Sequence, residues 1–147
     1  PWYWGAAPES LDSATQGPLA NIADGAEGGA RRGLSWELGR LWPDLDDGFF
    51  WHAPVGSFPP NRWGLHEMLG NVAEWTRCSY PQYSKYEPRQ HAAGDGAWPK
   101  SSSPIRVARG GSFKKSVEDA RCAKRFSLPA TSSSNNIGVR PARAIDP

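Results

Sequence analysis

Two glutamates lie in a short stretch of the chain that holds no basic residue to neutralise them. The stretch reads "GLHEMLGNVAEW", residues 64–75, and contains Glu67 and Glu74. Hard cations such as calcium take oxygen ligands from carboxylates and backbone carbonyls, and glycine lets a chain fold its carbonyls inward. The carbonyls of Gly70 and Val72, at alternate positions, could join the two carboxylates. From composition alone, solvent exposure of both glutamates is the simpler interpretation.

The cysteines and histidines of the chain do not have the spacing of a metal site or of a catalytic nucleophile with its base. Cys78 and Cys122 stand 44 positions apart without a CxxC motif, so neither a zinc site nor a disulfide framework is indicated. A buried thiol pair and a single bridge both stay open. His52, His66 and His91 form neither an HxxxH nor an HExxH pattern. Histidine-based metal chemistry is therefore disfavoured.

The elements that must position these residues are short. A length of 147 residues suits one domain, and 16 glycines, 14 prolines and 12% aromatic residues are typical of a loop-rich domain without long helices. Ser116 with Asp119 is a possible capping box, so one helical turn competes with strand there. Residues 81–103 resemble a long surface loop. Alternating apolar and polar residues predict strands at 105–113 and 121–126, and a turn with a last strand at 135–143.

Charge divides the chain into an acidic front and a basic back. Residues 1–96 hold 7 basic against 12 acidic residues, whereas residues 97–147 hold 10 against 3. No apolar run approaches the ~18 residues that a membrane span needs, so we expect a soluble chain, with no signal segment and the compartment left open. Nucleic acid is an unfavoured partner because basic residues are not interleaved with aromatic ones, and all tryptophans precede residue 99.

Four ordered blocks of the sequence resemble a known family. They are "APVGSFPPNRWGLHEMLGNVAEWT" (53–76), "RVARGGSF" (106–113), "RCAKR" (121–125) and "NNIGVR" (135–140). In this order they resemble the formylglycine-generating enzyme family, also called the sulfatase-modifying factor domain. The resemblance implies an α+β fold, a loop-rich variant of the C-type lectin fold. It further implies that residues 1–147 form the C-terminal portion of one such domain, with the N-terminal part as a bound partner chain.

The resemblance also assigns the acidic residues to calcium, at one or two ions. The first site would use the side chains of Asn21 and Asp47 and the carbonyls of Ile22 and Phe49. The second would use Glu67, in place of a usual aspartate or asparagine, the carbonyls of Gly70 and Val72, and Glu74. Calcium thus becomes the favoured interpretation of the opening stretch.

Two departures from the family argue against its reaction. The enzymes of the family oxidise a substrate cysteine with two cysteines that bind copper(I) just after Gly-Gly-Ser, whereas Lys114 and Lys115 stand there in this chain. No copper is therefore expected, and Cys78 and Cys122 are interpreted as buried small residues. Ala73 stands where the family commonly has a cleft tryptophan.

The preferred hypothesis is a non-catalytic, calcium-stabilised recognition module whose residues 112–136 bind a protein or small-molecule ligand. The variable proteins of diversity-generating retroelements share this frame, so residues 114–135 could be diversified. Alternatives are an oxidoreductase with altered chemistry and a regulatory appendage of a larger multidomain protein. The candidate ligand-binding residues are Ser112, Phe113, Lys114, Lys115, Ser116, Arg121, Lys124 and Asn136.

Overall fold

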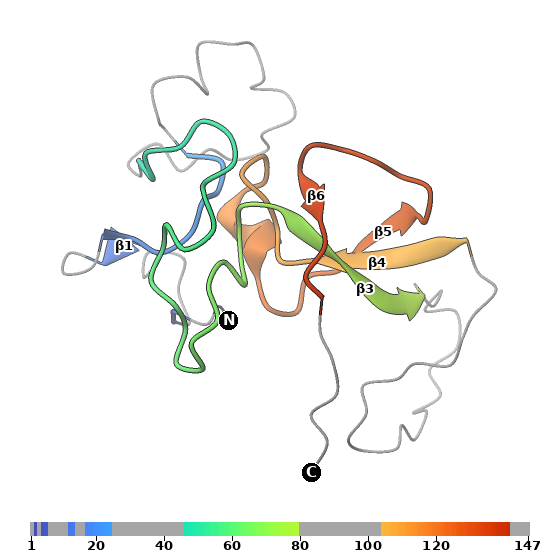
Figure 1. Cartoon of the computed structure of the whole chain (residues 1–147), viewed down its shortest axis with the longest axis horizontal. Coiled ribbons are helices and arrows are strands. Elements are labelled where there is room, and N and C mark those ends of the chain that lie inside the picture. The colour runs from blue at the N-terminus through green and yellow to red at the C-terminus, as the bar shows by residue number, and fades with distance from the viewer. Residues whose placement is uncertain are drawn as a thin grey trace.

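The centre of the fold is a small mixed sheet with strand order β5-β4-β3-β6 (Figure 1). The computed structural model describes residues 2, 4–5, 12–13, 17–24, 46–79 and 104–141. Strands β3 (Ala73–Ser79) and β4 (Ile105–Arg109) are antiparallel, as are β4 and β5 (Phe126–Pro129), whereas β6 (Ile137–Gly138) runs parallel to β3. A two-stranded ribbon of β1 (Asp12–Ser13) and β2 (Gly17–Pro18) lies apart from this sheet.

The predicted strand in 105–113 is confirmed, and it ends where the Gly-Gly pair begins. Val107 and Ala108 are buried in β4, and both Gly110 and Gly111 adopt positive φ after it. The predicted strand at 121–126 is wrong except for its last residue, because residues 121–125 form a bend and turn before β5. Lys124 N donates to the carbonyl of Arg121, which closes the turn that delays the strand.

A single 3-10 turn, η4 (Val117–Ala120), is the only helix among the described residues. Of the two alternatives for this segment, the helical turn is the one that forms. Ser116 is its N-cap residue, but its side chain makes no capping hydrogen bond, so the expected capping box is absent. No helix in the described part of the chain is long and apolar enough to cross a membrane. Val117 and Ala120 form the buried face of the turn.

The apolar core joins the N-terminal segments to η4. Trp2 packs in this cluster and donates its indole N–H to the carbonyl of Val117 at 2.8 Å. Glycine is required where two backbones meet, since a Cβ at Gly111 would lie 2.8 Å from the Cα of Ala120. The core cluster comprises Trp2, Leu19, Ala20, Ile22, Leu69, Val117 and Ala120.

Ordered loop, rather than regular structure, positions the acidic residues. Segment 46–72 runs beside the sheet without a strand of its own (Figure 1). Asn71, at φ 57°, joins three separate segments: its side chain exchanges hydrogen bonds with Ala53, its N–H donates to the carbonyl of Asn21, and its carbonyl accepts from Phe113 N.

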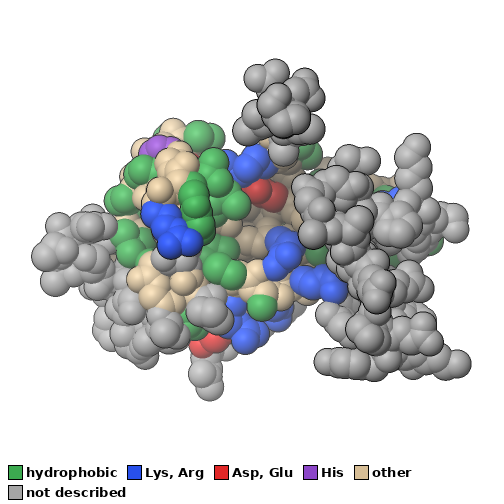
Figure 2. All heavy atoms as spheres, turned by 90° about the horizontal axis from the view of Figure 1, so that it is seen from below, with side chains coloured by type: hydrophobic (Ala, Val, Ile, Leu, Met, Phe, Trp, Pro, Cys, Tyr) green, Lys and Arg blue, Asp and Glu red, His purple; other side chains and the backbone are tan. Residues whose placement is uncertain are grey.

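Among the described side chains, lysine and arginine gather in the middle of the face drawn in Figure 2, beside hydrophobic groups.

Candidate functional site

The side chains predicted for the first calcium site lie together. Both carboxylate oxygens of Asp47 accept backbone N–H groups, Oδ1 from Phe49 at 2.9 Å and Oδ2 from Ile22 at 3.0 Å. Asn21 is fully buried, and its Nδ2 donates to the carbonyl of Trp51 at 2.7 Å. Its Oδ1 is buried with no hydrogen-bond partner. A buried acceptor without a donor is costly in a folded protein, and a cation would satisfy it.

Asp24 completes this group, and the sequence reasoning missed it. Its Oδ2 accepts the N–H of Asp47 at 2.6 Å, and both carboxyl groups are about 6% exposed. Burial, reinforced by the charge of Asp24, raises the pKa of Asp47 from 3.8 to about 7. Two buried carboxylates that repel each other, one of them bonded to the residue next to Asn21 with its unsatisfied amide oxygen, offer the oxygen donors that calcium prefers. The short spacing from Asn21 to Asp24 was the available signal.

Access and composition are compatible with a metal ion at this place. Asp47 and Phe49 line an open hollow of about 420 Å³, which would serve as an entry path. Among the described residues, no three His, Cys, Asp or Glu side chains form a metal-binding cluster. The first site supplies only two carboxylates, and its other candidate donors are an amide oxygen and main-chain carbonyls, which such a cluster does not include. We call the group of Asn21, Ile22, Asp24, Asp47 and Phe49 the first site.

The side chains predicted for the second calcium site are also engaged by donors, and one of these donors is a cation, Arg140. Glu67 is buried, and its carboxylate accepts from the N–H groups of Gly56 at 3.0 and 3.1 Å and Phe58 at 3.3 Å. Glu74 accepts from Arg140, with Nε at 2.9 Å and Nη2 at 2.7 Å from its Oε1. These side chains fit a cation less well than the first site does.

Arg140 also binds two main-chain carbonyls of this loop. Its Nη2 donates to the carbonyls of His66 at 2.9 Å and Glu67 at 3.1 Å. The hydrogen bond to Glu74 raises the pKa of the Arg140 guanidinium, so Arg140 stays charged. The guanidinium thus neutralises Glu74, which composition alone would have assigned to solvent.

Part of the predicted ligand surface is assembled around Ser112. Asn136 Nδ2 donates to the hydroxyl oxygen of the buried Ser112 at 3.3 Å, and Ser134 Oγ donates to Asn136 Oδ1 at 2.6 Å. The carbonyl of Asn136 accepts from Ala73 N, so the start of β3 fixes this polar pair. Ser112 and Asn136 therefore meet although they are 24 positions apart.

Aromatic and basic side chains surround this polar pair. Trp51 and His52 pack edge-on against Phe113, with ring centroids 5.6 and 4.9 Å away. Lys114 Nζ lies 5.9 Å from the centroid of the Trp51 ring and donates to Asn135 Oδ1 at 2.8 Å. Trp51, His52 and Asn135 were missed because their segments meet only in the fold. We call Trp51, His52, Ser112, Phe113, Lys114, Asn135 and Asn136 the recognition surface.

The other predicted ligand-binding residues lie on and around η4. Ser116 precedes the turn, Arg121 donates to the carbonyl of Glu118 at 2.8 Å, and Lys124 pairs with Asp119 at 2.6 Å. The carbonyl of Lys115 accepts from Ala23 N, which links this segment to the first site. None of these contacts joins them to the recognition surface.

The prediction that Cys122 is buried is wrong. The residue is exposed and free, not buried, because it follows η4 in the turn that replaces the expected strand. Its carbonyl accepts from Arg109 Nη2. The side chain of Cys78 lies outside the described part of the structure, as does His91.

The fold and these loops define a loop-rich mixed domain whose functional groups are presented by ordered loops around a small sheet. The family model for the sulfatase-modifying factor enzyme 1-like domain matches residues 15–145. The chain belongs to this family. The predicted family, and the loop-rich α+β fold class, are thereby confirmed.

Relatives of this chain differ in their described activity. Formylglycine-generating enzyme of Mus musculus is 37% identical over 100 residues, which cover 66% of this chain and 26% of that protein. Inactive C-alpha-formylglycine-generating enzyme 2 of Mus musculus is 34% identical over 103 residues, or 66% of this chain and 28% of that protein. Family membership alone therefore does not decide between an enzyme and a non-catalytic domain.

A solved structure shares the fold. PvdO from Pseudomonas aeruginosa superposes with a TM-score of 0.57 at 24% identity, over 88% of this chain and 41% of that chain. The chain thus spans about a quarter of the length of the curated relatives that it matches and less than half of the solved one.

Proposed function

We propose that the chain is a non-catalytic recognition module, stabilised by calcium, that binds a protein or small-molecule ligand through its recognition surface. A hydrogen bond between Asn21 and Trp51 joins the first site to the recognition surface, and this contact supports the proposal. Asn21 donates from Nδ2 to the carbonyl of Trp51, while its Oδ1 stays buried and unsatisfied in the first site. A calcium ion held by Oδ1 would fix the amide, and the amide would fix Trp51.

The chemistry of the first site supports calcium over a transition metal. Its donors are carboxylate, amide and main-chain oxygens, which suit hard cations. An ion there would neutralise the repulsion between Asp24 and Asp47 and would return Asp47 to its ionised form. The group would supply structural rigidity, and no reaction step depends on it.

The recognition surface has the composition of a binding site. Trp51 is 42% exposed and presents an aromatic face beside the ammonium of Lys114. Asn136, held by its hydrogen bond to the buried Ser112, adds a fixed polar group. Exposed aromatic rings flanked by a cation and rigid hydrogen-bonding groups are typical of recognition sites, and the cation favours an acidic or acceptor-rich ligand.

Sequence supports a non-catalytic role at the same place. Lys114 and Lys115 stand after Gly-Gly-Ser, where the resemblance puts the copper-binding cysteines of the enzymes. A lysine ammonium is neither a soft ligand nor a redox group, so it cannot replace a thiolate. The relative named as inactive is precedent for non-catalytic members of this family.

An immobilised chain tests the proposal against glycan and peptide arrays in calcium buffer. We expect any captured ligand to lose about tenfold in affinity on Trp51→Ala, which is ~1.4 kcal/mol, and little on Leu65→Ala. Leu65 is the control because, at 44% exposed, it is as accessible as Trp51 but lies outside the recognition surface. Equal losses in both variants would refute the assignment of the surface.

The alternative, an oxidoreductase of this family, is favoured by the identity to the mouse enzyme. It predicts that the chain converts the cysteine of a sulfatase-type peptide to an aldehyde when copper and oxygen are supplied. Mass spectrometry of the peptide decides between the two. Aldehyde formation by the chain, absent after Ser112→Ala, would overturn the non-catalytic proposal.

A further inference from the structure

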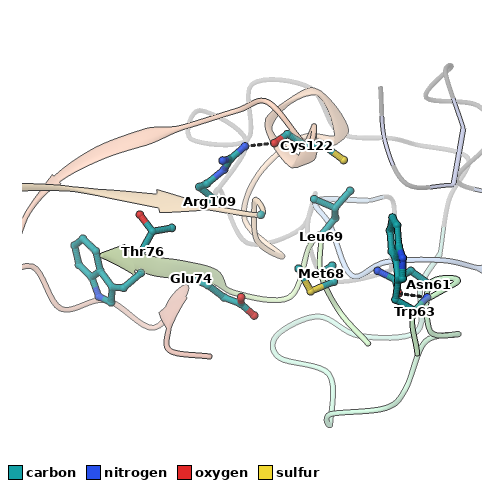
Figure 3. Close-up of a pocket in the computed structure, with 10 residues that line it drawn as sticks. Asn61, Trp63, Met68, Leu69, Glu74, Thr76, Arg109 and Cys122 are labelled. Carbon is teal, nitrogen blue, oxygen red and sulfur yellow. Dashed lines mark hydrogen bonds between the residues drawn. The ribbon is translucent and has the colours of Figure 1, made fainter. Parts of the chain in front are cut away.

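A second hollow, separate from the recognition surface, opens between β3, β4 and the loop before β3. It has a volume of about 370 Å³, within the range of small-ligand pockets. Figure 3 shows Arg109 at the end of β4 above Glu74 and Thr76 of β3, with Met68 and Leu69 to the right. The wall is completed by Asn61, Trp63, Trp75, Gly110 and Cys122. None of these residues belongs to the first site or to the recognition surface.

The floor and sides of this pocket are apolar. Leu69 is buried and Met68 and Trp75 are half-buried, while Trp63 is 66% exposed and stands at the rim with Arg62 stacked 4.1 Å from its ring centroid. A flat exposed indole over an aliphatic floor offers apolar contact on two sides. An apolar body of a few carbon atoms would be removed from water here.

The polar groups of the pocket differ in whether they are already hydrogen-bonded or can still bind a ligand. Thr76 Oγ1 donates to the carbonyl of Val107, and Glu74 is paired with Arg140, so both are engaged. Arg109 is exposed and lines the pocket; among the described residues its guanidinium donates through Nη2 to the carbonyl of Cys122, and its other N–H groups have no partner there. The Asn61 side chain accepts two N–H groups through Oδ1, which leaves its amide N–H₂ as a donor. The groups still available are therefore donors, and one is charged.

We propose that this pocket binds an apolar group that carries a carboxylate. The apolar body would lie between Trp63, Met68 and Leu69, and the carboxylate would accept from Arg109. Guanidinium and carboxylate form charge-assisted hydrogen bonds with fixed geometry, which gives both affinity and direction. Arg140 cancels the negative charge of Glu74, so the opposite wall does not repel the anion.

The test uses N-acetylphenylalanine and its uncharged amide as probes of the full chain. Titrations followed by nitrogen-15 NMR should show saturable shifts around Arg109 and Cys122, with the acid at least tenfold tighter than the amide. Arg109→Gln should remove this preference. Arg121→Gln is the matched control, because Arg121 is also exposed and also donates to one main-chain carbonyl. Equal affinity for acid and amide, or equal loss in both variants, overturns the proposal.

A second measurement needs no variant. Cys122 lines the pocket and is exposed and free, so bound acid should slow its alkylation by iodoacetamide, measured by peptide mapping, several-fold more than the amide does. No protection by the acid overturns the proposal even where Arg109→Gln fails to fold. An N-acetylated Gly-Gly-Phe peptide with a free C-terminal carboxylate separates the two sources of such a group. Tighter binding than that of N-acetylphenylalanine supports a polypeptide C-terminus, and equal binding supports a small molecule.

Discussion

Substituting Asp47 by asparagine should reverse the sign of its effect when calcium is removed. Burial and the neighbouring Asp24 raise the pKa of Asp47 to about 7, whereas its ordinary value is 3.8. The folded chain therefore holds this proton more tightly than the unfolded chain does. This contribution to stability is fully present below about pH 4 and is lost as the pH rises through about 7.

The magnitude follows from the same shift. The pKa of Asp47 is higher by about 3 in the folded chain than in the unfolded chain. In calcium-free protein above pH 7, this difference destabilises the fold by at most about 4 kcal/mol, because the carboxylate is then ionised. Asparagine carries no charge but gives up one of the two acceptors that bind Ile22 N and Phe49 N, at about 1 kcal/mol. In chelator at pH 8, Asp47→Asn should be about 2–3 kcal/mol more stable than the parent.

Urea unfolding with chelator and with calcium measures this difference. Calcium should stabilise the parent and leave Asp47→Asn unchanged, because the ion needs the ionised carboxylate. At pH 4 the advantage of the variant in chelator should disappear, since the Asp47 carboxyl then keeps its proton in the folded chain and keeps much of it in the unfolded chain as well. Asp47→Asn that is less stable than the parent in chelator at pH 8, by the same amount as in calcium, would refute the reasoning.

Three further substitutions test other parts of the account. Arg140→Met leaves Glu74 and two carbonyls without their donor and should lower the free energy of unfolding by about 1–3 kcal/mol equally with and without calcium, measured by urea titration. Gly70→Ala should cost at least about 3 kcal/mol, because a Cβ there would lie 2.4 Å from the carbonyl oxygen of Asn21 at a φ of 83°; thermal unfolding checks it, and a shift of melting temperature under a degree contradicts it. Lys114→Ala should weaken ligand capture and move the melting temperature little, since its ammonium bonds the exposed Asn135 and otherwise lies 5.9 and 5.7 Å from the Trp51 and Phe113 ring centroids.

Much of the fold could be predicted because its signals are local. Alternation over residues 105–109 and the Gly-Gly pair after them define β4 and its end. The strand expected at 121–126 failed because a turn closed by Lys124 N on the carbonyl of Arg121 delays it. The same turn exposes Cys122, which the resemblance had placed inside. Short alternating runs indicate that a strand exists better than where it begins.

The candidate sites divide in the same way. Asn21 and Asp47 could be assigned by resemblance, because motifs carry residues forward one at a time. Asp24 could not, since its role depends on the burial of its carboxylate against Asp47 N. Arg140 was missed because it lies 66 positions from Glu74, and only the parallel pairing of β6 with β3 brings them together. Long-range pairs of this kind leave no local pattern in one sequence.

Isothermal titration of the calcium-free chain with calcium chloride tests whether the first site binds calcium. We expect saturable binding of one ion, lost in Asp47→Asn and retained in Glu74→Gln, because the first site holds the unsatisfied oxygen while Glu74 is occupied by Arg140. Absence of saturable heat in the parent, or binding that survives in Asp47→Asn unchanged, would contradict it.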